Sequence, residues 1–100
     1  MKRTPILEPK YQGCANCSIL PKTTLKDTDK IKDYDFISLC INEMCVHVED
    51  ITIGEFLKQN NIKKDDCIEI FYMSAFHDET YELDTEDMKF KLVQQGPGYA

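Results

Sequence analysis

The sequence predicts a small α+β domain in which one short helix packs on a mixed sheet. Three observations carry this prediction. The chain has 100 residues, of which 42% are hydrophobic, as expected for one globular domain. Short segments after residue 36 alternate apolar and polar residues, as half-buried strands do. A single helix-start signal follows the second of these segments, so the expected element order is ββαβ(β)β.

Residues 1–35 have no sustained apolar period and are expected to form an irregular, cysteine-containing arm. They hold Pro5, Pro9 and Pro21, and a polar run follows at 22–33. Packing on the rest of the chain, or a bound metal, is what would order such an arm. The domain itself is expected at 36–93, with a flexible tail at 94–100.

Residues 36–48 carry the pattern of a β-hairpin. The alternating apolar residues are Ile37, Leu39 and Ile41 before Asn42-Glu43, and Met44, Val46 and Val48 after it. A two-residue turn at Asn42-Glu43 places Leu39 opposite Val46, so that both strands direct their apolar side chains to one face. The same register sets Cys40 opposite Cys45 on the other face.

The helix is expected to begin at Thr52. Thr52 as N-cap and Glu55 three residues later form a capping box, and Ile51 and Phe56 are spaced for a hydrophobic staple. Asn60-Asn61 offers a left-handed cap at the other end. The predicted helix is therefore short, about three turns at most.

Three further strands are expected after the helix. Alternating residues occur at 67–73, around Tyr81, and at 88–93. Pro97 cannot continue a strand, so the last strand must end before it.

The charge distribution favours a protein partner over a nucleic acid. Residues 1–35 contain seven Lys or Arg against five Asp or Glu, whereas residues 36–100 contain five against thirteen. An acidic domain repels phosphate backbones and is attracted to a basic protein surface. The longest apolar runs are far too short for a membrane span and no signal-peptide pattern begins the chain, so a cytoplasmic location is expected.

Four of the five cysteines form a candidate zinc site. Cys14 and Cys17 have the spacing of a zinc knuckle, and the hairpin register brings Cys40 and Cys45 together, with His47 as an alternative ligand. One structural zinc would then fix the arm on the hairpin. The spacing differs from a standard zinc ribbon, whose second pair repeats the first.

Other roles for the cysteines remain open. They are free or buried thiols in one interpretation, and Cys40 and Cys45 form a cross-strand disulfide in another, which a reducing cytosol opposes. Cys67 is expected to be an ordinary strand residue. Redox chemistry at Cys14 and Cys17 would need a helix directly after them, which Pro21 opposes.

Residues 36–98 resemble the ubiquitin-like β-grasp superfamily in the order of these elements: a hairpin, a helix opening at Thr52, and strands ending in a glycine-bearing tail. The resemblance implies a β-grasp fold. Members that are conjugated or carry sulfur end in Gly-Gly, which is adenylated. Here the tail reads Gly96-Pro97-Gly98, so activation at Gly98 would require removal of the last two residues.

No residue pattern indicates catalysis, because neither His47 nor His77 lies in a recognisable nucleophile motif. The chain is therefore expected to be a protein-interaction module, such as an adaptor, an inhibitor or an immunity-type protein, that binds a basic protein surface. One alternative is a ubiquitin-like modifier or sulfur carrier activated at Gly98. A second alternative is a small thiol redox protein that uses Cys14 and Cys17.

Overall fold

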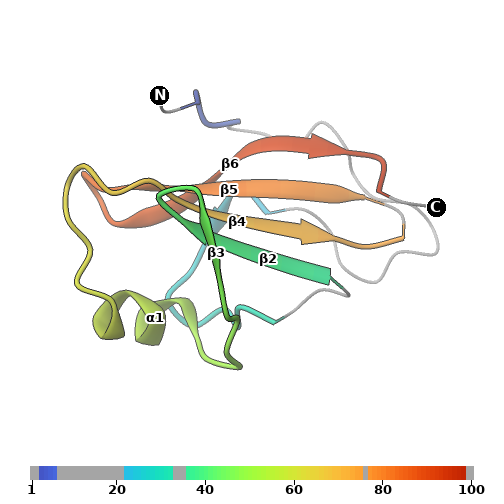
Figure 1. The fold of residues 1–100 in the computed structure, drawn as a ribbon. Helices are drawn as coiled ribbons and strands as arrows, with labels where there is room; N and C mark the ends of the chain where they lie inside the picture. The colour runs from blue at the N-terminus through green and yellow to red at the C-terminus, as the bar shows by residue number, and fades with distance from the viewer. Residues whose placement is uncertain (1–2, 7–21, 33–35, 76, 99–100) are drawn as a thin grey trace.

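The structure, a computed structural model, describes residues 3–6, 22–32, 36–75 and 77–98. Its elements are β1 (Thr24–Leu25), β2 (Phe36–Ile41), β3 (Met44–Val46), α1 (Ile53–Gln59), β4 (Ile68–Met73), β5 (Asp78–Asp84) and β6 (Lys89–Gly96). The strands form one sheet in the order β1-β6-β5-β4-β2-β3. Figure 1 shows this twisted sheet with α1 below one end of it.

The predicted α+β class, with a β-grasp-like mixed sheet packed on one helix, is wrong. Every neighbouring pair of strands in the six-stranded sheet is antiparallel. The helix has seven residues, and only Ile53 and Phe56 in it are buried. The fold is therefore dominated by its sheet.

The connections explain why the sheet is antiparallel. Short turns join β4 to β5 and β5 to β6, and a short turn makes the next strand run back beside the previous one. The helix connects β3 to β4, but β2 lies between these two strands and pairs antiparallel with both. Strands β3 and β4 therefore run parallel to each other with β2 between them, and α1 lies in the crossover that joins them. Because β2 separates the two, every hydrogen-bonded pair in the described sheet is antiparallel.

The hairpin of β2 and β3 has the predicted register. Asn42 and Glu43 have φ values of 51° and 71°, the left-handed values that a two-residue hairpin turn requires. Leu39 is opposite Val46, as predicted. Strand β3 ends at Val46, two residues before the predicted end of the hairpin.

The N-cap of α1 is confirmed, and its C-cap is not. The Thr52 hydroxyl accepts a hydrogen bond from the Glu55 N–H at 3.2 Å and donates to the Glu55 carboxylate at 3.1 Å. Asn60 is extended, with φ −106°, instead of left-handed. Its backbone N–H and its side-chain amide both donate to the Phe56 carbonyl, which satisfies the helix end without a left-handed residue.

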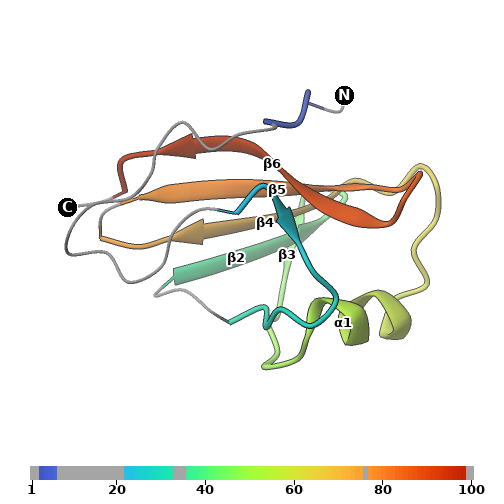
Figure 2. The ribbon, with the colours of Figure 1, turned by 180° about the vertical axis from the view of Figure 1, so that it is seen from behind.

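The core lies on one face of the sheet, under α1 and residues 22–32. Its buried residues are Leu25, Ile31, Leu39, Ile53, Phe56, Ile68, Ile70, Tyr72, Tyr81, Leu83, Phe90 and Leu92. Leu25 and Ile31 belong to the predicted arm, so the second half of that arm is part of the packed domain. Figure 2 shows this segment running from β1 to the start of α1.

The two edges of the sheet differ. At one edge β1 pairs with β6, and the Leu92 carbonyl accepts a further hydrogen bond from the Ile6 N–H at 2.5 Å. At the other edge β3 pairs only with β2 within the described part of the chain. Strand β6 extends to Gly96, past the expected start of the tail, and ends before Pro97 as predicted.

Within the described ranges, none of the helical structure is long and apolar enough to span a membrane.

Candidate functional site

The open edge strand β3 carries two exposed apolar side chains, those of Met44 and Val46. Its register puts Met44 opposite Ile41 and Val46 opposite Leu39, so both side chains lie on the core face of the sheet. Yet Met44 is 72% exposed and Val46 is 37% exposed, whereas Leu39 is 2% exposed. The core face therefore continues beyond the region that α1 covers.

A groove of about 240 Å³ lies between β3 and α1. Leu39, Ile41 and Ile31 line its apolar side. Val46, His47, Glu49, Ile51, Phe56, Gln59 and Asn60 complete the lining. The groove thus combines an apolar floor with polar side chains, the usual make-up of a site that binds an organic or peptide group.

One acidic side chain lines the groove, and two more lie on the elements beside it. Glu49 lines it, Glu43 lies in the turn that begins β3, and Glu55 is in the first turn of α1. All three side chains are exposed, and none forms an ion pair with the residues described in the structure. Their charges are consequently available to a basic partner.

Cys40 and Cys45 lie on the opposite face of the same hairpin. They are directly paired across β2 and β3, and their Sγ atoms are 3.3 Å apart. The Ser38 hydroxyl lies 4.0 Å from the sulfur of Cys40 and 3.9 Å from that of Cys45. Both cysteines are free thiols, as is Cys67.

The structure tests only half of the candidate zinc site. It brings Cys40 and Cys45 together, whereas Cys14 and Cys17 lie outside the described residues. His47 follows the end of β3 and lines the groove. In the described ranges, no three His, Cys, Asp or Glu side chains come together as metal ligands. The two thiols would supply two ligands to a soft metal ion, and a zinc site would need two more.

Two of these thiols have a raised pKa. The pKa of Cys40 is raised, first by its hydrogen bond to Cys45 and then by burial. The pKa of Cys67 is raised by burial, with Glu69 and Glu82 acting in the same direction. Cys45 is exposed, whereas Cys40 is half-buried, so Cys45 is the more accessible of the two paired cysteines.

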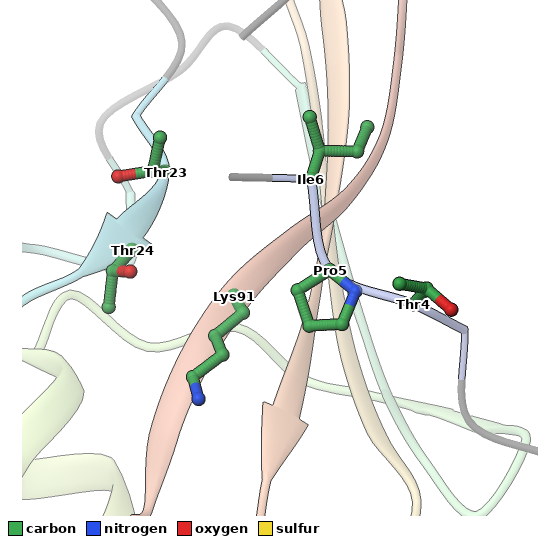
Figure 3. A pocket seen from close by; sticks show the side chains of 6 residues that line it. All are labelled: Thr4, Pro5, Ile6, Thr23, Thr24 and Lys91. Atoms are coloured by element: carbon green, nitrogen blue, oxygen red, sulfur yellow. The ribbon is translucent and has the colours of Figure 1, made fainter. Parts of the chain in front are cut away.

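A second cavity, of about 320 Å³, lies near the other edge of the sheet. Figure 3 shows Pro5 and Ile6 on one side of it, Thr23 and Thr24 on the other, and Lys91 between them. The Lys91 ammonium contacts two carboxylates, of Asp87 at 2.8 Å and Asp84 at 3.1 Å, which raise the pKa of Lys91. Its charge is already balanced, so none of the described residues that line this cavity is poised for acid–base chemistry.

Arg3 connects the N-terminal segment to the sheet. It forms ion pairs with Glu69 on β4 and, at 3.7 Å, with Glu82 on β5. It also donates a hydrogen bond to Gln94 on β6 at 2.6 Å. One guanidinium thus contacts side chains of three strands. Its positive charge offsets the negative charge of Glu82, whose side chain is buried at 6% exposure.

A serine, a histidine and a glutamate lie in a row beside the turn between β4 and β5. Ser74 Oγ is 3.4 Å from His77 Nδ1, and His77 Nε2 is 3.4 Å from Glu79 Oε1. These are residue types of a nucleophilic site. However, all three are buried, and the Ser74 hydroxyl donates to the His77 carbonyl at 3.0 Å. Burial lowers the pKa of His77, and the smaller opposing effect of the Asp78 charge does not reverse this. The arrangement stabilises the turn.

The C-terminal glycines lie in different settings. Gly96 is the last residue of β6 and pairs with Asp78 of β5. Gly98, the candidate conjugation residue, follows two residues later with φ 81°. This places Gly98 just beyond the sheet.

Comparison of the chain with protein-family models, with curated proteins and with solved structures returns no match.

Sequence reasoning missed the groove as a site. The sequence contains part of the pattern that would indicate this groove, because Met44 and Val46 were predicted on the apolar face of a hairpin. Their exposure depends on where α1 and β4 pack, and no local pattern reports that.

Proposed function

We propose that this chain is a protein-interaction module that binds a basic, extended segment of a partner protein along β3 and the groove beside α1. The observation that carries the proposal is the edge strand β3, whose core-face side chains Met44 and Val46 are exposed. Large apolar side chains left uncovered on a sheet edge are typical of surfaces that pair with another chain.

The backbone of β3 supplies the first part of the recognition. Along a strand of an antiparallel pair, the backbone N–H and C=O groups of successive residues point alternately toward the partner strand and away from it. Asn42 and Glu43 both have positive φ, so Met44, next to the turn, and Val46, two residues further on, occupy hydrogen-bonded positions opposite β2. The N–H and C=O of Cys45 therefore face the open edge. An extended peptide that adds a strand there gains main-chain hydrogen bonds.

The groove supplies the second part. A side chain of the added strand that points to the core face meets Val46, Ile51 and Phe56. A volume of about 240 Å³ accommodates one or two apolar side chains. Alternate residues of the partner would therefore be apolar, as in other cases of strand addition.

Charge determines which extended segments bind. Glu49 lines the groove, Glu43 precedes β3 and Glu55 lies in the first turn of α1, and the whole chain has a net charge of −6. Lysine or arginine side chains at the flanking positions of the partner would be attracted, and acidic segments would be repelled. Binding of a basic protein surface is the function expected from the sequence, and the proposal assigns it to β3 and the groove. A cytoplasmic location remains part of the proposal.

A displayed library of random short peptides tests the proposal, because it samples the sequences of extended partners without bias. We expect selection on the full chain to enrich peptides that alternate apolar residues with Lys or Arg. Binding of an enriched peptide should shift the backbone amide resonances of residues 44–49. Its affinity should fall as the salt concentration rises.

A matched pair of charge reversals provides the control. Glu49→Lys changes the groove, and Glu86→Lys makes the same change of charge in the turn between β5 and β6, outside the groove lining. We expect Glu49→Lys to weaken the enriched peptide by about fivefold and Glu86→Lys by less than about twofold. Enrichment of acidic peptides, or equal losses in both variants, would contradict the proposal.

A further inference from the structure

We infer that Cys40 and Cys45 form a dithiol site that a low-molecular-weight disulfide, such as glutathione disulfide, converts into a disulfide across β2 and β3. This inference concerns the face of the hairpin opposite the groove. It does not rest on the proposed function.

The distance between the sulfur atoms is the first support. The Sγ atoms lie 3.3 Å apart, about 1.3 Å farther than in a disulfide bond. Both residues carry free thiols. A rotation of the two side chains, with a small shift of the backbone, is sufficient to close this gap.

The backbone geometry is the second support. Asn42 and Glu43 both have positive φ, which identifies a type I′ turn, and in such a turn the flanking residues form the hydrogen-bonded pair. By alternation, Cys40 and Cys45 form the next, non-hydrogen-bonded pair. Cα atoms of such pairs are about 4.5 Å apart, inside the range that disulfides accept.

The position of β3 at the sheet edge is the third support. Cys45 is exposed, and its strand is bonded only to β2 within the described part of the chain. An edge strand can shift to allow bond formation without disturbing a neighbour on its other side. The thiol face also lies away from α1, so the helix does not block access to Cys45.

The reaction proceeds in two exchange steps. The Cys45 thiolate attacks one sulfur of glutathione disulfide, the reagent's S–S bond breaks, and one glutathione thiolate leaves. Cys40 then loses its proton and attacks the Cys45 sulfur, which expels the second glutathione thiolate. Two protein thiols are oxidised, one disulfide is reduced, and the two protons end on the two released glutathione molecules.

The different settings of the two thiols fix this order. Cys45 is exposed, whereas Cys40 is half-buried. The disulfide reagent therefore reaches Cys45 first, and Cys40 reacts only once the adduct lies beside it. The bond would be reversible, as disulfides in reducing compartments are.

The test uses the full chain exposed to excess glutathione disulfide, followed by alkylation of the remaining thiols. Cleavage after Glu43 separates the two cysteines onto different fragments, because Glu43 lies between them. We expect the fragments with Cys40 and Cys45 to remain joined, at a mass lower by two hydrogens, and to separate after reduction. Fragments that separate without reduction would overturn the inference.

Two single replacements test the order of attack. Cys40→Ser should stop the reaction at a glutathione adduct on Cys45, and Cys45→Ser should form an adduct on Cys40 about tenfold more slowly. Cys67→Ser, the control, should leave the Cys40–Cys45 product unchanged. The inference fails if either sulfur joins another cysteine, or if both resist oxidation until a chelator removes a bound metal.

Discussion

Asp29 shows how one side chain orders the segment before the helix. Its carboxylate accepts hydrogen bonds from the Lys26 N–H at 2.8 Å and from the Lys22 ammonium at 3.1 Å. Its backbone carbonyl accepts from the Ile53 N–H at 2.9 Å, at the start of α1. Burial by itself raises the pKa of Asp29, but the Lys26 amide and then Lys22 outweigh it, so the pKa lies below its ordinary 3.8.

Asp29→Asn should therefore reduce both stability and its dependence on pH. The depressed pKa means that Asp29 contributes stability above about pH 3.8, and that this contribution is lost as the pH falls through the folded pKa. At neutral pH we expect a loss of about 1 kcal/mol, because one charged hydrogen-bond acceptor is removed. Urea unfolding at neutral pH and near pH 3 measures both values. A difference between wild type and variant that stays constant down to the lower pH would contradict this account.

At the scale of elements, the N-terminus of α1 depends on residues 27–31. The first N–H groups of a helix have no partner within it. Here the Ile53 N–H donates to Asp29 and the Gly54 N–H donates to the Asp27 carbonyl at 3.0 Å. A Cβ at Gly54 would lie 3.2 Å from that same carbonyl oxygen.

Gly54→Ala should consequently destabilise the protein. In an ordinary helix this replacement stabilises by about 1 kcal/mol. Here we expect a loss of about 1 kcal/mol, because the loop must move away and its hydrogen bond to the helix lengthens. Lys58→Ala, at an exposed position of the same helix, should change stability by less than about 0.5 kcal/mol. Thermal unfolding of both variants decides the matter, and a gain in stability for Gly54→Ala would refute the close contact.

At the scale of the whole molecule, residues 22–32 are a structural part of the domain. Leu25 is 3% exposed and Ile31 is 1% exposed, and both pack in the same cluster as the sheet. The Lys22 N–H donates to the Tyr81 hydroxyl at 3.0 Å, and the same hydroxyl donates to the Lys22 carbonyl. Removing this segment would uncover the core face.

Leu25→Ala should destabilise the whole fold by about 2–4 kcal/mol, the usual cost of emptying a buried leucine site. Unfolding should remain a single transition that moves to lower denaturant concentration, since the segment and sheet share one core. Thr24→Ala, at the half-buried neighbouring position, is the control and should cost less than about 1 kcal/mol. A small effect of Leu25→Ala would show that β1 is only an appendage.

The local elements could be predicted because their causes are local. A two-residue turn fixes which residues face each other, so the pairs Leu39 with Val46 and Cys40 with Cys45 followed from the sequence. The N-cap at Thr52 likewise depends on residues three positions apart. In the same way, the turn alone is enough to pair the two thiols of the inferred dithiol site.

The antiparallel sheet could not be predicted, since alternation identifies the faces of a strand and not its neighbours. Strand β1 has two residues, too few to show any alternation, and its pairing with β6 joins positions far apart in the chain. The resemblance to a β-grasp fold relied on the order of elements, which several sheet arrangements share.

The hairpin, the start of the helix, the acidic surface and the pairing of two cysteines could all be predicted, because each depends on neighbouring residues or on composition. The folded chain adds a wholly antiparallel sheet, a core completed by residues 22–32, and, in the described part of the chain, an open edge at β3 beside a groove. Those features arise from packing between distant segments. Packing selects one arrangement among several that satisfy the same local pattern.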